Sequence, residues 1–265
     1  MDKNRGFIIK VAAAATYLIM ITVNALANAI PINGVTTGQV SDSYPDLFAP
    51  ATITFSIWAL IYLLLAGYSL YQFGFFQADR GAAREELFQN IGLFFAISSV
   101  ANTFWIFAWH YNVIWLSLVF MLVVLASLIM IATRLREEEF SLKEKAFIRL
   151  PFSIYFGWIT VATIANVTTF LVSIGWGGFG IPDQVWMVII LLVGAAIGIA
   201  RMTRDRDIAY GLVIIWAYAG ILNKHISPAE FAGQYPAVII TAIIGIIMLV
   251  VAKVFLVYPG LKRAA

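Results

Sequence analysis

Long apolar segments alternate with short polar segments along the whole chain. These segments approach or exceed the roughly 20 residues that a helix needs to cross a bilayer. A lone spanning segment satisfies its backbone hydrogen bonds internally only as a helix, and the two-residue alternation of barrel strands is missing. The pattern therefore predicts an all-α, polytopic integral membrane bundle of about eight transmembrane helices. We expect them at residues 7–30, 51–73, 88–108, 112–133, 149–174, 184–202, 208–223 and 235–257, the seventh being the shortest.

Composition supports a membrane location and excludes several classes of protein. Of the 265 residues, 62% are hydrophobic and 12% are charged, with a mean hydropathy of +0.90. An ordinary soluble domain carries about 25% charged residues, so little polar sequence remains for a separate soluble domain. We therefore expect the lipid bilayer as the main partner, and no nucleic acid. The chain has no cysteine, which excludes disulfides, thiolate metal sites and iron–sulfur clusters.

The basic residues are distributed unevenly between the two sides of the predicted bundle. Of the 17 Lys and Arg residues, only Lys224 falls in a segment between spans on the side opposite the amino terminus. Basic residues concentrate on the cytoplasmic side of membrane proteins. We therefore expect a multi-pass protein of the plasma membrane with both termini in the cytoplasm.

The first 29 residues also have features of a signal peptide: a basic start, an apolar run and the small-residue sequence Ala27-Asn28-Ala29. The apolar run is longer than the roughly 7 to 15 residues of a normal signal core. We therefore expect this segment to be retained as the first span.

The first outside loop, residues 31–50, is twenty residues long, with three prolines and no Lys or Arg. Connections of this length are usually functional or disordered. We expect a lid over an intramembrane pocket, with a plain connector as the alternative. His110 and His225 also fall in outside loops, but no carboxylate accompanies them at ligand spacing, so we expect no metal site.

Asparagine and tryptophan residues recur at matched depth in the first, second, third and fifth spans. A rise of 1.5 Å per residue places most of them about 9 to 12 Å below the outer helix ends. Buried amide groups need hydrogen-bond partners and should face inward. They either hold the bundle together or face a ligand. The residues of this layer are Asn24, Asn28, Trp58, Asn102, Trp105 and Asn166.

The remaining tryptophans divide by depth. Near the outer surface an interfacial aromatic belt accounts for them without any ligand. Trp158 and Trp216 lie too deep for a belt, as do Trp58 and Trp105, and serve either as core packing or as a flat wall for a planar ligand. The predicted belt residues are Trp109, Trp115, Trp176 and Trp186.

Short motifs in the second and third spans resemble those of a known membrane protein family. The stretch Phe55 to Gly67, FSIWALIYLLLAG, resembles that family's second helix, in which an aromatic residue and a Trp are followed by a Tyr and a Gly. Trp58 and Tyr62 occupy the Trp and Tyr positions. Asn102-Thr103-Phe104-Trp105 is similar to the Asn and Trp signature of its third helix.

A third motif lies in the fifth span, where Pro151, Trp158, Ala162 and Asn166 follow one another as in the same family's fifth helix. Together the motifs identify residues 7–174 as resembling the TspO/MBR family, the tryptophan-rich sensory or translocator proteins. The family's Pro-Val-Trp is replaced here by Ser-Ile-Trp, and the last three spans have no counterpart in the usual five-helix chain.

The resemblance implies a five-helix membrane domain at residues 1–174 and a three-helix carboxy-terminal extension at residues 175–265. It also implies an outer-side pocket, roofed by the first loop, that binds tetrapyrroles such as porphyrins, or sterol-like molecules. We therefore expect a membrane receptor or sensor with no cofactor other than a tetrapyrrole as ligand, and a homodimer stays open. The expected ligand-binding residues are Asn24, Asn28, Trp58, Tyr62, Asn102, Trp105, Trp158 and Asn166.

Three other functions are less well supported by the sequence. A secondary transporter is the main alternative, although no Asp, Glu or Arg lies at mid-membrane to couple ions. A retinal protein needs a lysine deep in its last helix, and Lys253 is too close to the cytoplasmic end. Enzymatic degradation of a tetrapyrrole is a possibility only through the family, because no paired intramembrane acids and no hydrolase or zinc motif are found.

Overall fold

The computed structural model describes residues 3–75 and 82–258. Within these ranges the chain is helical, without a β-strand, and each long helix overlaps one of the expected spans. The all-α prediction is therefore confirmed. The long helices are α1 (Lys3–Ala29), α3 (Ile57–Gln72), α4 (Ala82–His110), α5 (Ile114–Arg136), α7 (Leu150–Ser173), α8 (Asp183–Asp205), α9 (Ile208–Ile226) and α10 (Pro236–Val257).

Short helical turns connect the long helices. The first connection contains three of them: η1 (Ile32–Gly34), α2 (Thr37–Asp42) and η2 (Thr52–Ser56). The others are α6 (Leu142–Glu144), η3 (Lys145–Arg149) and η4 (Gly178–Gly180). Ser141 begins α6 with a capping box, in which its hydroxyl accepts the Glu144 N–H and its own N–H donates to the Glu144 carboxylate.

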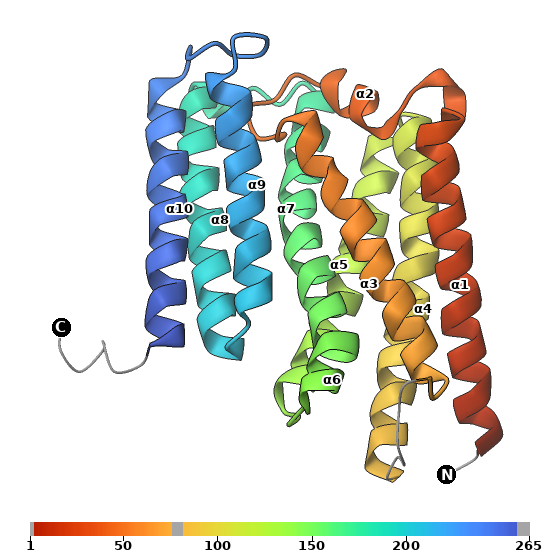
Figure 1. Cartoon of the computed structure of the whole chain (residues 1–265). Coiled ribbons are helices and arrows are strands. Elements are labelled where there is room, and N and C mark those ends of the chain that lie inside the picture. The colour runs from red at the N-terminus through yellow and green to blue at the C-terminus, as the bar shows by residue number, and fades with distance from the viewer. Residues whose placement is uncertain (1–2, 76–81, 259–265) are drawn as a thin grey trace.

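Seven helical stretches in the described ranges are long and apolar enough to cross a membrane, which makes this a multi-pass membrane protein. α9 is not one of these seven stretches, although it lies beside α8 and α10 in the bundle (Figure 1). Its last turn carries the polar residues Lys224 and His225. The seventh expected span is thus a helix of the bundle, and it is less apolar than the seven stretches that could cross a membrane.

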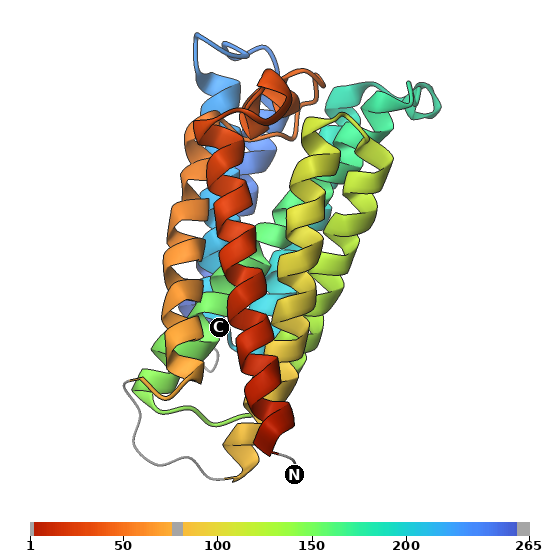
Figure 2. The same cartoon turned by 90° about the vertical axis from the view of Figure 1, so that its right-hand side faces the viewer.

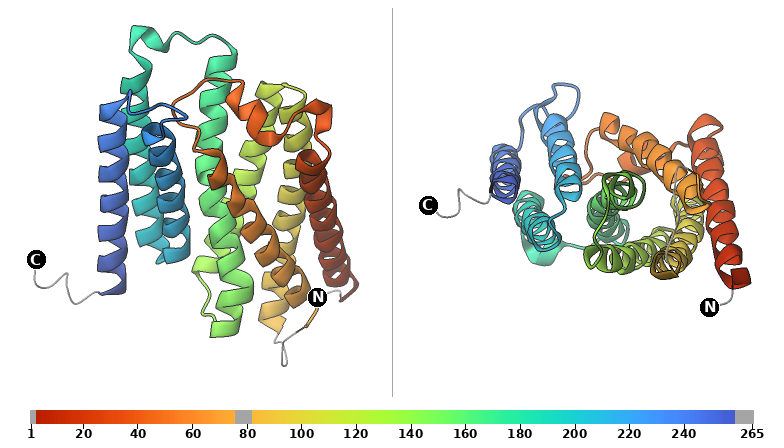
Figure 3. Two further views of the ribbon diagram at one scale, coloured as in Figure 1. Left: turned by 45° about the horizontal axis from the view of Figure 1, so that its top comes forward. Right: turned by 60° about the horizontal axis from the view of Figure 1, so that its bottom comes forward.

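The long helices form two neighbouring groups. α4 packs against α1 and α5, and α7 packs against α3 and α5, which gives a five-helix group. α8, α9 and α10 contact one another and form the second group, visible beside the first in Figure 3. α9 is the main link, because it packs along α7.

Glycines allow close packing in the second group. A Cβ atom on Gly194 of α8 would lie 2.7 Å from the Tyr218 hydroxyl of α9. One on Gly198 would lie 3.1 Å from Leu249 of α10. These two glycines, four residues apart, therefore bring three helices together.

The first connection lies across one end of the bundle, and the described ends of the chain, at Lys3 and Val257, lie at the other (Figure 1). In the perpendicular view α2 crosses above the tops of the neighbouring helices (Figure 2). We call residues 31–56 the roof. The space beneath the roof is lined by residues from α1, α3, α4 and α7, in the parts of these helices nearest the roof.

Candidate functional site

Two adjacent cavities lie beneath the roof. The larger one, of about 270 Å³, is bordered by α1, α3 and the roof, and its polar lining residues are Asn24, Asn28, Thr36, Thr37, Thr52 and Tyr62. We call it the polar cavity. The smaller one, of about 40 Å³, extends toward α7 and includes Trp109, Trp158, Val161, Ala162 and Ala165 in its lining. We call it the aromatic cavity, and Thr37, Phe55, Trp58 and Trp105 border both.

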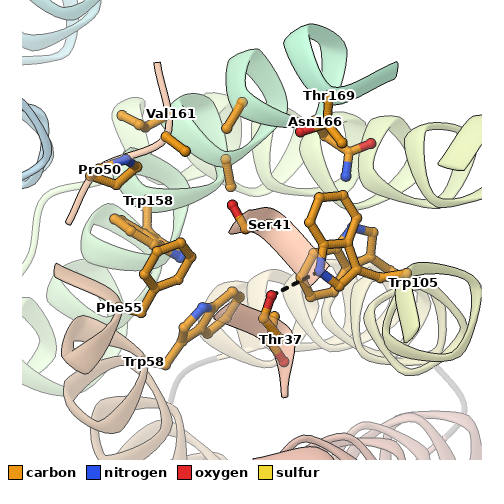
Figure 4. A pocket seen from close by; sticks show the side chains of 14 residues that line it. Thr37, Ser41, Pro50, Phe55, Trp58, Trp105, Trp158, Val161, Asn166 and Thr169 are labelled. Atoms are coloured by element: carbon orange, nitrogen blue, oxygen red, sulfur yellow. Dashed lines mark hydrogen bonds between the residues drawn. The ribbon is translucent and has the colours of Figure 1, made fainter. Parts of the chain in front are cut away.

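Aromatic rings form a wall of the aromatic cavity (Figure 4), and Phe55, Trp58 and Trp105 of this wall also border the polar cavity. Trp58 stacks on Tyr62 with centroids 5.4 Å apart, and it meets Trp158 edge to face at 6.3 Å. Phe55 also meets Trp158 edge to face, at 5.7 Å. Edge-to-face and offset-stacked pairs are the favoured geometries of aromatic rings, so this wall is held in place before anything binds.

Two of the indole N–H groups in this wall have no hydrogen-bond partner in the part of the chain that the structure describes. They belong to Trp105 and Trp158, whose side chains are 6% and 2% exposed. By contrast, Trp109 donates its indole N–H to the Thr37 carbonyl at 3.1 Å, the bond drawn in Figure 4. An unpaired buried donor costs about 1 to 3 kcal/mol, so these two donors need an explanation.

The asparagines of the predicted layer have different roles. The Asn24 side-chain amide donates to the Asn102 side-chain oxygen Oδ1 at 2.8 Å, and the Asn102 amide Nδ2 donates to the Tyr155 hydroxyl at 3.4 Å. This chain joins α1, α4 and α7. Asn102 is 1% exposed and is not among the residues that line either cavity. Its contacts are those of a residue that holds the bundle together.

The other asparagines border the cavities. Asn28 lies one turn above Asn24 and donates to the Asn24 carbonyl at 3.0 Å, within α1. Asn166 of α7 accepts a hydrogen bond from the Ser117 hydroxyl of α5 at 3.2 Å. Both side chains line a cavity. Of the eight expected ligand-binding residues, seven line one or both cavities, and Asn102 lies behind them.

His110, the last residue of α4, fixes the first half of the roof. Its Nδ1 donates to the Ile32 carbonyl and its Nε2 is hydrogen-bonded to the Thr37 hydroxyl, both at 3.1 Å. The His110 carbonyl accepts from the Asn33 side chain at 2.9 Å. His110 was expected in an exposed loop, but it is completely buried because the roof folds over it.

α9 fixes the second half of the roof. The His225 Nε2 donates to the Leu47 carbonyl at 2.9 Å, and the Gly220 carbonyl accepts the Ala51 N–H at 3.1 Å. Lys224 forms an ion pair with Asp42 at 3.6 Å. Trp216 donates its indole N–H to the Thr54 carbonyl at 3.0 Å. The second histidine is thus also a completely buried structural residue and not a loop residue.

A carboxylate shapes the roof from within. Asp46 Oδ1 accepts the N–H groups of Phe48 and Ala49 at 2.8 and 2.7 Å and so closes a tight turn. Burial raises the pKa of the Asp46 carboxyl above its ordinary value, although these two hydrogen bonds oppose that shift. Asp46 is not among the lining residues of either cavity.

The structure corrects the interpretation of two tryptophans. Trp109 was expected in an interfacial belt, but it is 5% exposed and lines the aromatic cavity, because α2 covers it. Trp216 was expected to serve as core packing or as a wall for a planar ligand. It is 42% exposed on α9 and lines neither cavity, while Trp115 is exposed as a belt residue would be.

Several roof residues that line the cavities were missed by sequence reasoning, chiefly Thr37 and Ser41. A signal was present, since Thr36 and Gln39 have the spacing of a capping box, and they form one at the start of α2. That spacing would have predicted a helix within the loop. It would not have predicted which face of the helix meets the cavity.

These features define a class: a polytopic membrane helix bundle with an aromatic-walled, roofed cavity at one end. A family model described as TSPO-like protein matches residues 10–255, and the chain belongs to this family. The resemblance derived from the motifs is thereby confirmed. The matched region also includes α8, α9 and α10, beyond the residues that carry the motifs.

Neither the curated proteins nor the solved structures include a match to this chain.

We predict that Asn102→Leu will destabilise the bundle. It removes two interhelical hydrogen bonds, and each such bond is worth about 0.6 kcal/mol on average in membranes. Asn28→Leu is the matched control, because the side chain of Asn28 hydrogen-bonds within α1 and to no other helix of the described part of the chain. Thermal melting of the purified proteins in detergent should show a lower Tm for the first variant and little change for the second. Equal Tm values would argue against the scaffold role of Asn102.

We predict that Gly220→Ala will push the roof away from α9. A Cβ atom on Gly220 would lie 2.0 Å from the Thr54 hydroxyl oxygen, and overpacking of this kind costs about 1 to 3 kcal/mol. Thr54→Ala in the same chain removes the two nearest atoms and should restore part of the lost Tm. If the two substitutions are simply additive in their effects on Tm, the proposed contact does not limit stability.

Proposed function

We propose that the protein is a membrane receptor or sensor that binds a planar hydrophobic ligand in the paired cavities beneath the roof. The observation that carries this proposal is the aromatic wall formed by Phe55, Trp58, Trp105 and Trp158. Flat rings at two sides of a narrow space suit a flat apolar ligand. Membership of the TSPO-like family supports a binding or sensing role, and the resemblance noted above suggests tetrapyrroles or sterol-like molecules.

Binding without catalysis is the simpler proposal. None of the described residues that line the two cavities is Asp, Glu, His, Lys or Arg. General acid–base catalysis usually requires one of these groups within hydrogen-bond reach of the substrate. Degradation of the ligand is therefore not part of the proposal.

A secondary transporter for a small hydrophobic or amphipathic molecule is the alternative proposal. The residues that line the two cavities belong to the roof and to the parts of the helices near it, so transport would also require a route to the other end of the bundle. Ion-driven flux of a ligand into proteoliposomes would favour this alternative over sensing.

We propose that the roof faces the outside and both termini face the cytoplasm of the cell that carries the protein in its plasma membrane. The basic residues near the end opposite the roof support this orientation. Reporter fusions at residue 40 and at residue 140 should then report outside and inside, respectively. A cytoplasmic signal from residue 40 would reverse the proposed orientation.

We predict that Trp58→Ala will weaken ligand binding, because Trp58 borders both cavities and contacts three other rings. Removing a buried aromatic anchor typically costs about 1 to 3 kcal/mol, or about 5- to 150-fold in affinity. The measurement is equilibrium dialysis of a porphyrin and a sterol against protein in nanodiscs, with empty nanodiscs subtracted.

Trp115→Ala is the control for this experiment, because it removes an exposed tryptophan from α5. The Trp115→Ala variant should bind the porphyrin or sterol with the same affinity as the wild-type protein. If Trp58→Ala retains full affinity in a folded protein, the ligand binds elsewhere. If neither probe binds wild-type protein above empty nanodiscs, a different class of ligand must be sought.

A further inference from the structure

The two unpaired indole donors restrict the chemistry of the occupant. Trp105 borders both cavities and Trp158 borders the aromatic cavity, and each offers an N–H that no described residue accepts. A cavity of about 40 Å³ can hold a water molecule, which would satisfy such a donor while the site is empty. A ligand that displaces this water without supplying an acceptor loses affinity. The occupant should therefore carry a hydrogen-bond acceptor close to its ring system.

The charge of the site restricts the occupant further. The described residues that line the cavities are all uncharged. The charged residues of the roof and of α9 beside it, Asp42, Asp46 and Lys224, are not in the lining, and Lys224 is already paired with Asp42. A carboxylate in the cavities would lose its hydration without gaining a cationic partner, which is strongly unfavourable.

The shape of the site suggests how a ligand would be oriented. Phe55 and Trp58 border both cavities, with small apolar residues such as Val161 and Ala165 on one side and Asn28 and Thr36 on the other. Amides and hydroxyls are neutral groups that can donate and accept. The two cavities have volumes of about 270 and 40 Å³, so together they only just reach the lower limit of the common range of about 300 to 1,000 Å³ for ligand pockets. A compact ring system fits this site better than a large one.

We propose that the site selects a compact, uncharged planar molecule with a carbonyl-type acceptor, and that it rejects carboxylates. The acceptor receives the indole N–H of Trp158 or Trp105, and any further neutral polar group lies in the polar cavity. This inference rests on the proposed function and gives the class of ligand for the same site. It disfavours tetrapyrroles with free acid side chains, even though tetrapyrroles are expected from the family resemblance.

Three tricyclic probes of one shape test the proposal: fluorene, 9-fluorenone and 9-fluorenone-4-carboxylate. They differ by one carbonyl acceptor and by one negative charge. Binding is measured by equilibrium dialysis against the full-length protein in nanodiscs of neutral lipid, with empty nanodiscs subtracted. We expect fluorenone to bind about tenfold more tightly than fluorene, and the carboxylate to bind at least tenfold more weakly than fluorenone.

Trp158→Phe keeps an aromatic ring and removes the N–H. It should lower the affinity for fluorenone and leave the affinity for fluorene unchanged. Trp105→Phe is a second variant of the same kind, in case the first does not fold, and Trp115→Phe removes an exposed indole N–H as the control. Loss of fluorene and fluorenone affinity together would mean that the indoles act only through packing, and would overturn the acceptor requirement.

The remaining outcomes separate this inference from the proposed function. If the carboxylate binds as tightly as fluorenone, and Trp58→Ala weakens both, the proposed site stands and the neutrality requirement is wrong. If no tricyclic probe binds but a porphyrin or a sterol does, the compact uncharged class is wrong while a planar-ligand site remains. If neither the tricyclic probes nor the porphyrin and sterol bind above empty nanodiscs, both proposals fail.

Discussion

Lipid tails offer no hydrogen-bond partners, and this constraint determines where almost every polar side chain of the bundle lies. Asn24, Asn102 and Tyr155 satisfy one another in a chain across three helices. The serine and threonine hydroxyls on the helices mostly donate hydrogen bonds to backbone carbonyls of their own helix, as Thr163 does to Ile159. Some buried hydroxyls of the described residues, such as those of Ser69 and Ser99, also have no partner. The unpaired N–H groups of Trp105 and Trp158 differ from these because both residues border the aromatic cavity.

The helices could be predicted from sequence because their signal is local. An apolar run of known length must be a helix in lipid, and the structure differs from the expected bounds by a few residues at most helix ends. Depth could also be predicted, since it depends only on the rise per residue. Trp58 and Trp105 were therefore assigned to one layer, and both border the aromatic cavity.

The direction in which a side chain faces could not be predicted in the same way. Asn102 and Asn166 lie at similar depth, yet only Asn166 borders a cavity, because that depends on how α4 and α7 are rotated in the bundle. His110 and Trp109 were misjudged for a related reason. Nothing in their local sequence reveals that a loop from 70 residues earlier folds back over them.

The hydrogen bond between His225 and Leu47 joins residues that are 178 apart in the sequence. The second half of the roof can therefore be fixed only after both residues have been synthesised. The ribosome makes Leu47 early, but the helix that holds it is almost the last part of the chain to be made. At about 5 to 20 residues per second, the interval is on the order of 10 to 35 s. During this time the aromatic cavity lacks a fixed cover, although its walls already exist. A chain whose synthesis stops after α7 therefore leaves the second half of its roof without its partners on α9.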